Sequence, residues 1–382
     1  MSNAEKIAPR SLPAWTYTSE SFFAAEREKL FAGAWQLVCH LNDIPDVGDY
    51  FTFEFLGELI VVLRGEDGEP RAFHNVCRHR ATRLLDGPSG KCPGRITCPY
   101  HAWGYDLDGW LVSVPFDREF AKMDSSTRRL ALVEHEVWQG FIFIRLKPGG
   151  PSVADQFAPY VDEIAPYRFP ELQPLGRVTM RPRDANWKNI ADNYVDALHV
   201  DVAHPGLKAM FGNTYGIEVK GDLHKMWGDL VNSGKDTPST RAYKEVLPDV
   251  DWLPEEKRRQ WVYYRLWPNL ALDIYPDQVD FMQFIPISPT KTMIREIPYA
   301  IPDERREMKA ARYLNWRVNR QVNAEDAALI ARVQQGMGSS SFTSGPFAER
   351  EILLIDSAER IRQTIPAARH ETEPPAGWLE AG

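Results

Sequence analysis

The first half of the chain alternates short apolar runs with turn-forming residues, which is a pattern typical of β-structure. Four of these runs predict strands, at residues 50–54, 58–64, 71–76 and 137–145. Ahead of them, a stretch over 19–36 is rich in Ala, Glu and Phe, begins with a serine and predicts a helix. The sequence Pro148-Gly149-Gly150-Pro151 interrupts the pattern, so we place a domain boundary near residue 150.

The second half of the chain mixes predicted helices and strands. A helix is predicted over 186–203, and two more over 303–336 and 347–364. Strand-like runs lie between them, near 261–275, 279–286 and 291–299. This organisation predicts three regions, which are an N-terminal helical segment over 1–36, a first domain over 37–150 and a second domain over 151–382.

Composition narrows the class of protein. The 382 residues are 43% hydrophobic and 26% charged, which is ordinary for a globular chain. A net charge of −8 argues against nucleic acid as a partner, because that role requires a basic surface. No apolar run approaches the roughly 18 residues of a membrane span, and the first residues lack a signal-peptide pattern. We therefore expect a cytoplasmic location and no membrane partner.

Two short segments of the first half contain metal-ligand residues. They read Cys77-x-His79 and Cys98-x-x-His101, and each supplies one thiol and one imidazole. Two thiolates and two imidazoles form a complete set of four ligands. In a reducing cytosol, cysteines of this kind bind metal more often than they form disulfides.

Two kinds of metal site use such a ligand set, a structural zinc and a Rieske [2Fe–2S] cluster. Small zinc modules keep like ligands together, in C-x2–4-C and H-x3–5-H pairs. In a Rieske cluster, two cysteines hold one iron and two histidines hold the other, so each loop can supply one of each. The mixed spacing therefore favours the cluster. Cys39 and Cys92 have no matching partner pair and are interpreted as structural.

A second group of candidate ligands lies on the helix predicted over 186–203. Asp196 and His199 fall on one face of that helix. His204 would lie off this face, but Pro205 disfavours the helical conformation at the residue before it. The helix can therefore end there and let His204 approach His199. Two such histidines supply two-thirds of a 2-His-1-carboxylate iron site.

The two motifs together, in this order, resemble those of the catalytic alpha subunits of Rieske non-haem iron (ring-hydroxylating) oxygenases. The resemblance covers roughly residues 20–365. Residues 75–80 and 98–109 look like the two cluster loops of that family, although Ala102 stands where glycine is usual. The family pattern D-x2-H-x4-H matches Asp196, His199 and His204.

The resemblance implies a third iron ligand on a late helix. The matching residue is Asp326 rather than Glu325, although Ala331 stands where the family often has glutamate. Asp192 and Asn193 are candidates for residues that support the iron ligands without binding the metal.

Asp196 has a different implied role. In the family, the matching carboxylate is not a ligand but joins a cluster histidine of one subunit to an iron-binding histidine of the next. The resemblance therefore implies that His101 of one subunit meets Asp196, and through it His199, of its neighbour. It also implies a homotrimer, because the electron path crosses between subunits.

The resemblance further implies the fold and the cofactors. The fold is α+β, with a Rieske [2Fe–2S] β-sandwich domain and a helix-grip (START-like) catalytic domain containing a curved antiparallel sheet. The cofactors are a [2Fe–2S] cluster and a mononuclear Fe(II). Electrons come from NAD(P)H through a separate reductase, alone or with a ferredoxin, since the chain has no G-x-G-x-x-G motif of its own.

The implied function is that of a terminal oxygenase, which uses O2 to mono- or dioxygenate a small organic substrate. The aspartate at position 196 favours an aromatic ring over a quaternary ammonium compound, and the chain length favours an oxygenase without a small β subunit. Three alternatives stay open. They are an N- or O-demethylating monooxygenase of a betaine-like or methoxy-aromatic compound, a Rieske electron carrier, and a ligand-binding helix-grip protein with a structural metal.

The substrate pocket is expected between the helix 186–205, the segment 207–245, interpreted as a loop, and the strands 261–299. Aromatic side chains there suit either a planar ring or, through cation–π contacts, a quaternary ammonium. The candidates are Met210, Phe211, Tyr215, Trp227, Tyr263, Tyr264, Trp267, Tyr275, Phe281 and Phe284.

Overall fold

The computed structural model describes residues 8–124, 128–375, 377 and 378, which form two compact units. The small unit comprises Ala32–Asp155 and Arg168–Pro174, and the large unit comprises the rest of the described chain. Within the described residues, none of the helices combines the length and the apolar character that crossing a membrane requires.

The small unit is built from antiparallel sheets. One sheet has the order β4-β3-β2-β5, a second β1-β10-β9 and a third β6-β7-β8. The strands are β1 (Gln36–His40), β2 (Asp49–Phe55), β3 (Glu58–Arg64), β4 (Pro70–His74), β5 (Ser89–Lys91), β6 (Ile96–Thr97), β7 (Gly104–Tyr105), β8 (Leu111–Ser113), β9 (Glu134–Trp138) and β10 (Phe141–Arg145). β3 is buried along its length from Ile60 to Leu63, which gives this unit its core.

The single strand predicted over 137–145 is instead a hairpin, formed by β9 and β10. Gln139 and Gly140 make the turn, and both have positive φ values, of 50° and 84°. Two-residue turns of this kind match the twist of the flanking strands. A side chain at position 140 would also lie 2.3 Å from the His40 ring. The prediction was wrong because the apolar residues on both sides of this turn read as one run.

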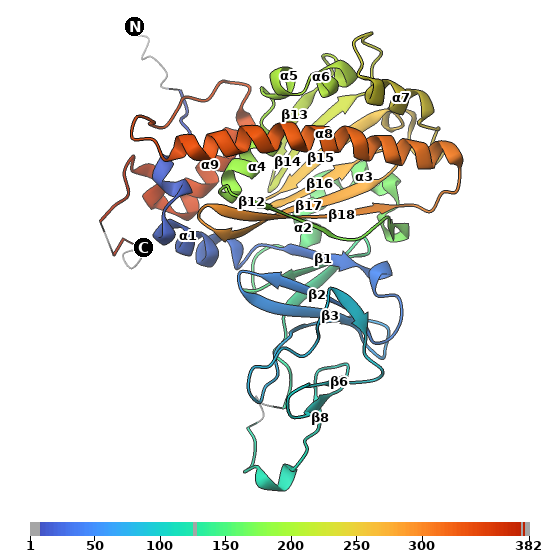
Figure 1. The fold of residues 1–382 in the computed structure, drawn as a ribbon, viewed down its shortest axis with the longest axis vertical. Coiled ribbons are helices and arrows are strands. Elements are labelled where there is room, and N and C mark those ends of the chain that lie inside the picture. Colours follow the sequence, from blue (N-terminus) through green and yellow to red (C-terminus); the bar gives the residue numbers. More distant parts are fainter. Residues whose placement is uncertain (1–7, 125–127, 376, 379–382) are drawn as a thin grey trace. The chain divides into compact units, whose positions relative to one another are not determined.

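The large unit contains a broad antiparallel sheet, in which neighbouring strands follow the order β13-β14-β15-β16-β17-β18, and β12 pairs with β18 (Figure 1). Its strands are β12 (Thr179–Arg183), β13 (Gly216–Lys220), β14 (Leu223–Asp229), β15 (Gln260–Leu266), β16 (Leu270–Ile274), β17 (Val279–Ser288) and β18 (Lys291–Ala300). The remaining short strand of the chain is β11 (Gln173–Pro174).

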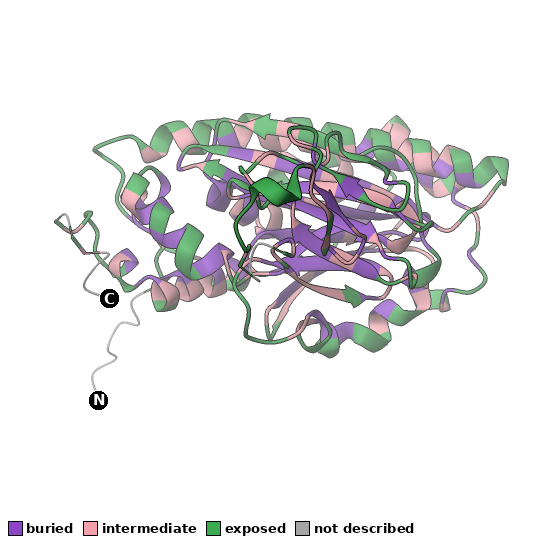
Figure 2. Cartoon of the chain, turned by 90° about the horizontal axis from the view of Figure 1, so that it is seen from below, coloured by how far each residue is buried: buried purple, intermediate pink, exposed green. Residues whose placement is uncertain are grey.

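Helices cover this sheet. The long helix α8 runs across it in Figure 1, and Figure 2 shows buried strands beneath helices whose outer faces are exposed. The helices of the described chain are α1 (Glu20–Glu26), α2 (Val153–Phe157), α3 (Val161–Ile164), α4 (Trp187–Val195), α5 (Val200–Ala203), α6 (Pro205–Phe211), α7 (Pro238–Val246), α8 (Arg306–Met337) and α9 (Ile352–Thr364).

Several sequence predictions correspond to observed elements of the large unit. Strands β17 and β18 cover the runs near 279–286 and 291–299, and α8 and α9 lie within or close to the two predicted C-terminal helices. The predicted N-terminal helix is shorter than expected. Its Ser19 caps α1, with the Phe22 amide donating to Ser19 Oγ at 3.1 Å, and the helical segment ends at Phe31.

Other predictions for the large unit were wrong in detail. The run 261–275 is a hairpin of β15 and β16, and the segment 207–245 is not a loop, because it holds most of α6, the strands β13 and β14 and most of α7. The helix predicted over 186–203 is broken into α4 and α5. The break lies next to the candidate iron ligands.

Candidate metal centres

The four candidate ligands of the Rieske cluster lie on two loops of the small unit. The two loops have the same backbone hydrogen bond and a similar conformation. The amide of Cys77 donates to the Thr82 carbonyl, and the amide of Cys98 donates to the Trp103 carbonyl, each at 2.8 Å. In each loop, an alanine four residues after the cysteine has a left-handed φ, 56° at Ala81 and 54° at Ala102. Glycine tolerates this conformation best, which gives a physical reason for the glycine that is usual at position 102.

The side chains of these loops converge. The rings of His79 and His101 have centroids 4.6 Å apart, and Trp103 stacks on His79 at 4.8 Å. Cys77 and Cys98 are buried free thiols. The Nδ1 atoms of both histidines are buried without a hydrogen-bond partner in the described structure. Buried polar atoms of a folded protein are almost always partnered. Two such nitrogens beside two buried thiols therefore fit a group that takes all four as ligands, as a Rieske cluster does.

The other two cysteines, interpreted from the sequence as structural, lie outside the two cluster loops. Cys39 lies within strand β1 and Cys92 follows strand β5, and both are buried. Burial raises the pKa of the Cys92 thiol to about 11, which leaves it protonated at neutral pH.

The second candidate centre lies in the large unit, where His199, His204 and Asp326 come together. Their ligand atoms all lie within 4.8 Å of one another. Asp326 Oδ1 is 3.0 Å from His204 Nε2 and 3.5 Å from His199 Nε2. Two imidazoles and one carboxylate that converge from three segments fit a facial iron site with open positions.

The charges of this group favour a metal cation. Burial raises the pKa of Asp326, but hydrogen bonds from His199 and His204 outweigh it and bring the pKa down to about 2. Burial likewise lowers the pKa of His199, while Asp196 and Asp326 raise it to about 9. The carboxylates therefore attract a positive charge at this point.

The break between α4 and α5 places the two histidines. Asp196 ends α4 in an extended conformation, and its side chain accepts a hydrogen bond from the Leu198 amide at 2.8 Å. Such a local side-chain bond competes with the helix, which explains why the predicted continuous helix does not form. His199 then precedes α5, and His204 lies between α5 and Pro205, the first residue of α6.

Asp196 contacts one of these ligands. Its Oδ2 lies 3.4 Å from His199 Nδ1. This is the contact expected within one chain, while the contact expected with His101 of a second subunit stays a prediction.

Two residues support the iron-site ligands. Glu325 Oε2 lies 2.7 Å from His204 Nδ1, and Asn193 Nδ2 donates to Asp326 Oδ1 at 3.0 Å. From the sequence, Asn193 was a candidate for a residue that supports the iron ligands. Glu325 was considered only as the third iron ligand, and Asp326 was preferred to it. A carboxylate on the second ring nitrogen of a ligand histidine fixes its tautomer and orientation. The Gln321 amide, one helical turn before Glu325, donates to Glu325 Oε1 at 2.9 Å, and no sequence pattern indicates the contact of Glu325 with His204.

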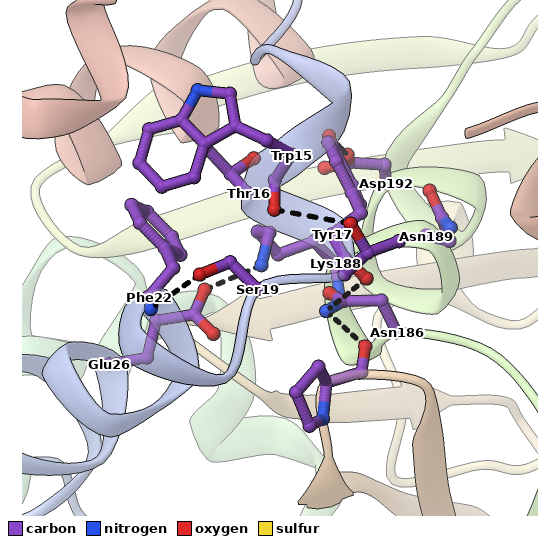
Figure 3. Close-up of polar contacts among 12 residues, drawn as sticks. Trp15, Thr16, Tyr17, Ser19, Phe22, Glu26, Asn186, Lys188, Asn189 and Asp192 are labelled. Atoms are coloured by element: carbon purple, nitrogen blue, oxygen red, sulfur yellow. Dashed lines mark hydrogen bonds and ion pairs between the residues drawn. The ribbon is translucent and has the colours of Figure 1, made fainter. Parts of the chain in front are cut away.

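Asp192, the other supporting candidate, belongs to a separate buried cluster that anchors α4 (Figure 3). The Tyr17 hydroxyl donates to Asp192 Oδ2 at 3.3 Å. In the same cluster, Lys188 Nζ lies 2.6 Å from Glu26 Oε1, and both side chains are buried. Asn186 caps α4 by accepting from the Lys188 amide at 2.9 Å. These contacts join α4 to the N-terminal segment that contains α1.

A cavity of about 110 Å³ opens beside the iron-site residues. Of the ten aromatic or large apolar candidates, Tyr215, Tyr263, Tyr275 and Phe284 line it, whereas the other six do not. The sequence did not anticipate the acidic side chains there. Asp273 and Asp280 are cross-strand partners on β16 and β17, in one row with Tyr263 on β15.

The hydrogen bonds of these two carboxylates come from neutral side chains. Asp273 accepts hydrogen bonds from the hydroxyls of Tyr194 and of Tyr275, the latter at 3.2 Å, and Gln278 donates to Asp280 at 2.9 Å. Within the described residues, no Lys, Arg or His forms an ion pair with either. Burial raises the pKa of Asp273 to about 7, and burial and Glu296 raise the pKa of Asp280 well above its ordinary value.

Comparisons with known proteins agree with this geometry. A family model described as the ring hydroxylating alpha subunit (catalytic domain) matches residues 169–367, and one for the Rieske [2Fe-2S] domain matches residues 34–125. The carnitine monooxygenase oxygenase subunit of Escherichia coli (strain K12) is 33% identical over 339 residues, which cover 87% of this chain and 85% of that protein.

Two further relatives act on related compounds. The chloroplastic choline monooxygenase of Atriplex hortensis is 27% identical over 344 residues, covering 88% of this chain and 73% of that protein. The crystal structure of a quaternary ammonium Rieske monooxygenase in complex with L-carnitine is 25% identical. It matches with a TM-score of 0.78 and covers 94% of this chain and 97% of that one.

Proposed function

The chain belongs to the Rieske ring-hydroxylating oxygenases, and from this premise we propose that its substrate is a small quaternary ammonium compound. Membership makes it a terminal oxygenase, an oxidoreductase with a Rieske [2Fe–2S] domain and a mononuclear iron domain that requires O2 and a reductase. The substrate is the part that we infer from the pocket and from the relatives.

The observation that carries the proposal is the pair of carboxylates formed by Asp273, which is half-buried, and Asp280, which is buried. A buried carboxylate without a cationic partner is costly, and a bound cation removes that cost. The hydroxyphenyl rings of Tyr194, Tyr215 and Tyr263 line the same cavity, and ring faces attract a quaternary ammonium by cation–π interaction. A neutral aromatic hydrocarbon would offer these two groups no charge with which to pair.

The chain's own residues would hold the metal groups at two places. Cys77 and Cys98 with His79 and His101 suit the cluster, and His199, His204 and Asp326 suit the iron. When bound, the cluster supplies electrons and the iron supplies a site for O2 activation.

The supporting residues keep the second site in place. Glu325 holds the His204 ring by its Nδ1, and Asn193 holds the Asp326 carboxylate. Asp273 and the tyrosines would hold the substrate cation beside these ligands and exclude water from it. Oxidation would then fall on a carbon next to the nitrogen, because the cation fixes which end of the substrate faces the metal.

Some expectations from the sequence do not fit the relatives. The preference for an aromatic ring rested on the aspartate at position 196, yet the similar proteins act on carnitine and choline. A role in aromatic hydrocarbon catabolism is therefore unsupported, and the quaternary ammonium alternative is the better one. The homotrimer, the bridge from Asp196 to a neighbouring His101 and the cytoplasmic location stay predictions.

The test uses the enzyme loaded with cluster and iron and supplied with electrons by a surrogate reductase. O2 uptake and product formation are measured with L-carnitine, glycine betaine and choline, and with indole and naphthalene. We expect O2 uptake matched by an oxidised or dealkylated product for at least one quaternary ammonium compound. Coupled oxidation of the aromatic compounds alone would overturn the proposal.

A further inference from the structure

We propose that Arg183 binds a carboxylate of the substrate, so that this chain selects zwitterionic, betaine-type ammonium compounds over simple cations. This inference rests on the proposed function. It adds that the substrate carries a carboxylate at the end opposite its ammonium group. It starts from Arg183, which lines the substrate cavity and forms no ion pair with an acidic group of the described chain.

Arg183 is the last residue of β12, and its backbone pairs with Thr292 of β18. Its side chain is half-buried and lines the cavity beside the iron site. Its Nη1 donates a hydrogen bond to the carbonyl of its neighbour Pro182, at 3.1 Å. No ion pair joins it to a carboxylate of the described chain.

The nearby carboxylates are engaged in other contacts. Glu296 pairs with Arg181, and Asp280 accepts both hydrogen bonds of the Gln278 amide. Burial and the positive charge of Arg181 both lower the pKa of Arg183. A guanidinium held in this way has a free planar face of donors, which matches a carboxylate.

Arg183 lies where two cavities meet. The inner cavity, of about 110 Å³, contains the iron-site residues, and an outer cavity of about 560 Å³ lies next to it. Arg183, Asp280 and Glu296 line both. Asp273 and the tyrosines line only the inner cavity, whereas Arg181 and Arg320 line only the outer one.

The cavities therefore differ in charge along the path toward the iron site. The inner end offers an unpaired carboxylate and aromatic rings, which attract a cation. The outer cavity holds Asp280, the ion pair of Arg181 with Glu296, and two further arginines, Arg183 and Arg320, which attract an anion. A zwitterion satisfies both ends in one orientation only, with its ammonium group toward the iron-site residues and its carboxylate toward Arg183. A simple cation satisfies the inner end but leaves Arg183 without a partner.

The experiment compares glycine betaine with choline, which share the trimethylammonium group but end in a carboxylate and a hydroxyl. Dissociation constants are measured by calorimetry on the metal-loaded enzyme, together with kcat and KM, for the wild type, Arg183→Gln and Arg183→Lys. Arg177→Gln is the matched control, because Arg177 is exposed and lies just before β12, outside both cavities.

We expect Arg183→Gln to weaken glycine betaine binding by about 10- to 100-fold, which is typical for the loss of a charged hydrogen-bonded contact. Choline binding should be unchanged or slightly tighter, because a like charge has been removed. Arg183→Lys should restore part of the loss, since lysine keeps the charge but not the planar donor pair. Arg177→Gln should bind both compounds as the wild type does.

Equal weakening for both compounds, or no change for glycine betaine, would overturn the assignment while the proposed function stands. Failure of the wild type to bind any quaternary ammonium compound would overturn both. Retention of choline binding in Arg183→Gln shows that the variant is folded and that its inner cavity is intact.

Discussion

At the scale of single residues, the proposed preference for a quaternary ammonium compound depends on the polar groups of the pocket, above all Asp273 and Asp280. Asp273 and Asp280 occupy ordinary polar positions in strand-like runs, where such residues are usually exposed. Their burial comes from the helices that cover the sheet, which a strand pattern does not encode. Tyr215, Tyr263 and Tyr275 were among the candidates from the sequence, because aromatic residues suit a pocket whatever its charge, whereas Tyr194 was not.

The first prediction at this scale concerns pH. Burial raises the pKa of Asp273 to about 7, while the Tyr194 and Tyr275 hydroxyls oppose the shift. The carboxylate is thus neutral below that pH and negative above it. Choline binding should tighten as the pH rises from about 6 to about 8, because only the ionised form attracts the cation. Calorimetry on the metal-loaded enzyme across this range measures the effect.

The Asp273→Asn variant removes the titrating group from this measurement. We expect its choline affinity to be about tenfold lower at pH 8 and nearly independent of pH. Asp251→Asn is the control, since Asp251 is exposed and lies outside the cavity. If choline binding by Asp273→Asn shows the same pH dependence as the wild type, another group causes that dependence.

At the scale of elements, the position of α4 determines where the iron-site histidines lie. The residue types and spacing of His199 and His204 were readable from the sequence, and Pro205 correctly marked a change of conformation. The break after Val195 was not readable, because it depends on which hydrogen bond the Asp196 side chain makes. The ion pair that anchors α4 to α1 could not be predicted from the sequence either, because Glu26 and Lys188 are 162 positions apart.

The ion pair between Glu26 and Lys188 carries the prediction at this scale. The Glu26 side chain is 0% exposed and that of Lys188 is 2% exposed. Removing one partner leaves a buried charge, so Glu26→Ala should lower the free energy of unfolding by about 3–5 kcal/mol. Glu28→Ala, at an exposed position of the same helical segment, should change it by less than about 0.5 kcal/mol. Denaturant unfolding measures both values, and similar values for the two variants would refute a buried anchor.

At the scale of the whole molecule, the sequence identified two metal-binding motifs in one chain, and this was enough for the family. The motifs are short and local, so no knowledge of tertiary structure was needed to find them. The division into units is less simple than one boundary near residue 150. Arg168–Pro174 belongs to the small unit, where the Phe169 carbonyl lies 3.1 Å from His40 Nε2. The amino-acid composition of this segment does not show that it packs with the small unit rather than with the residues on either side of it.

The central claim is that these two sets of residues hold a cluster and a separate iron. The most direct test is iron and acid-labile sulfide per chain, after anaerobic purification and Fe(II) reconstitution, for the wild type and Asp326→Ala. We expect about three irons and about two sulfides in the wild type. The variant should keep the two sulfides and lose about one iron. A wild type that stays at about two irons, or a variant that keeps all of them, would contradict the iron site at His199, His204 and Asp326.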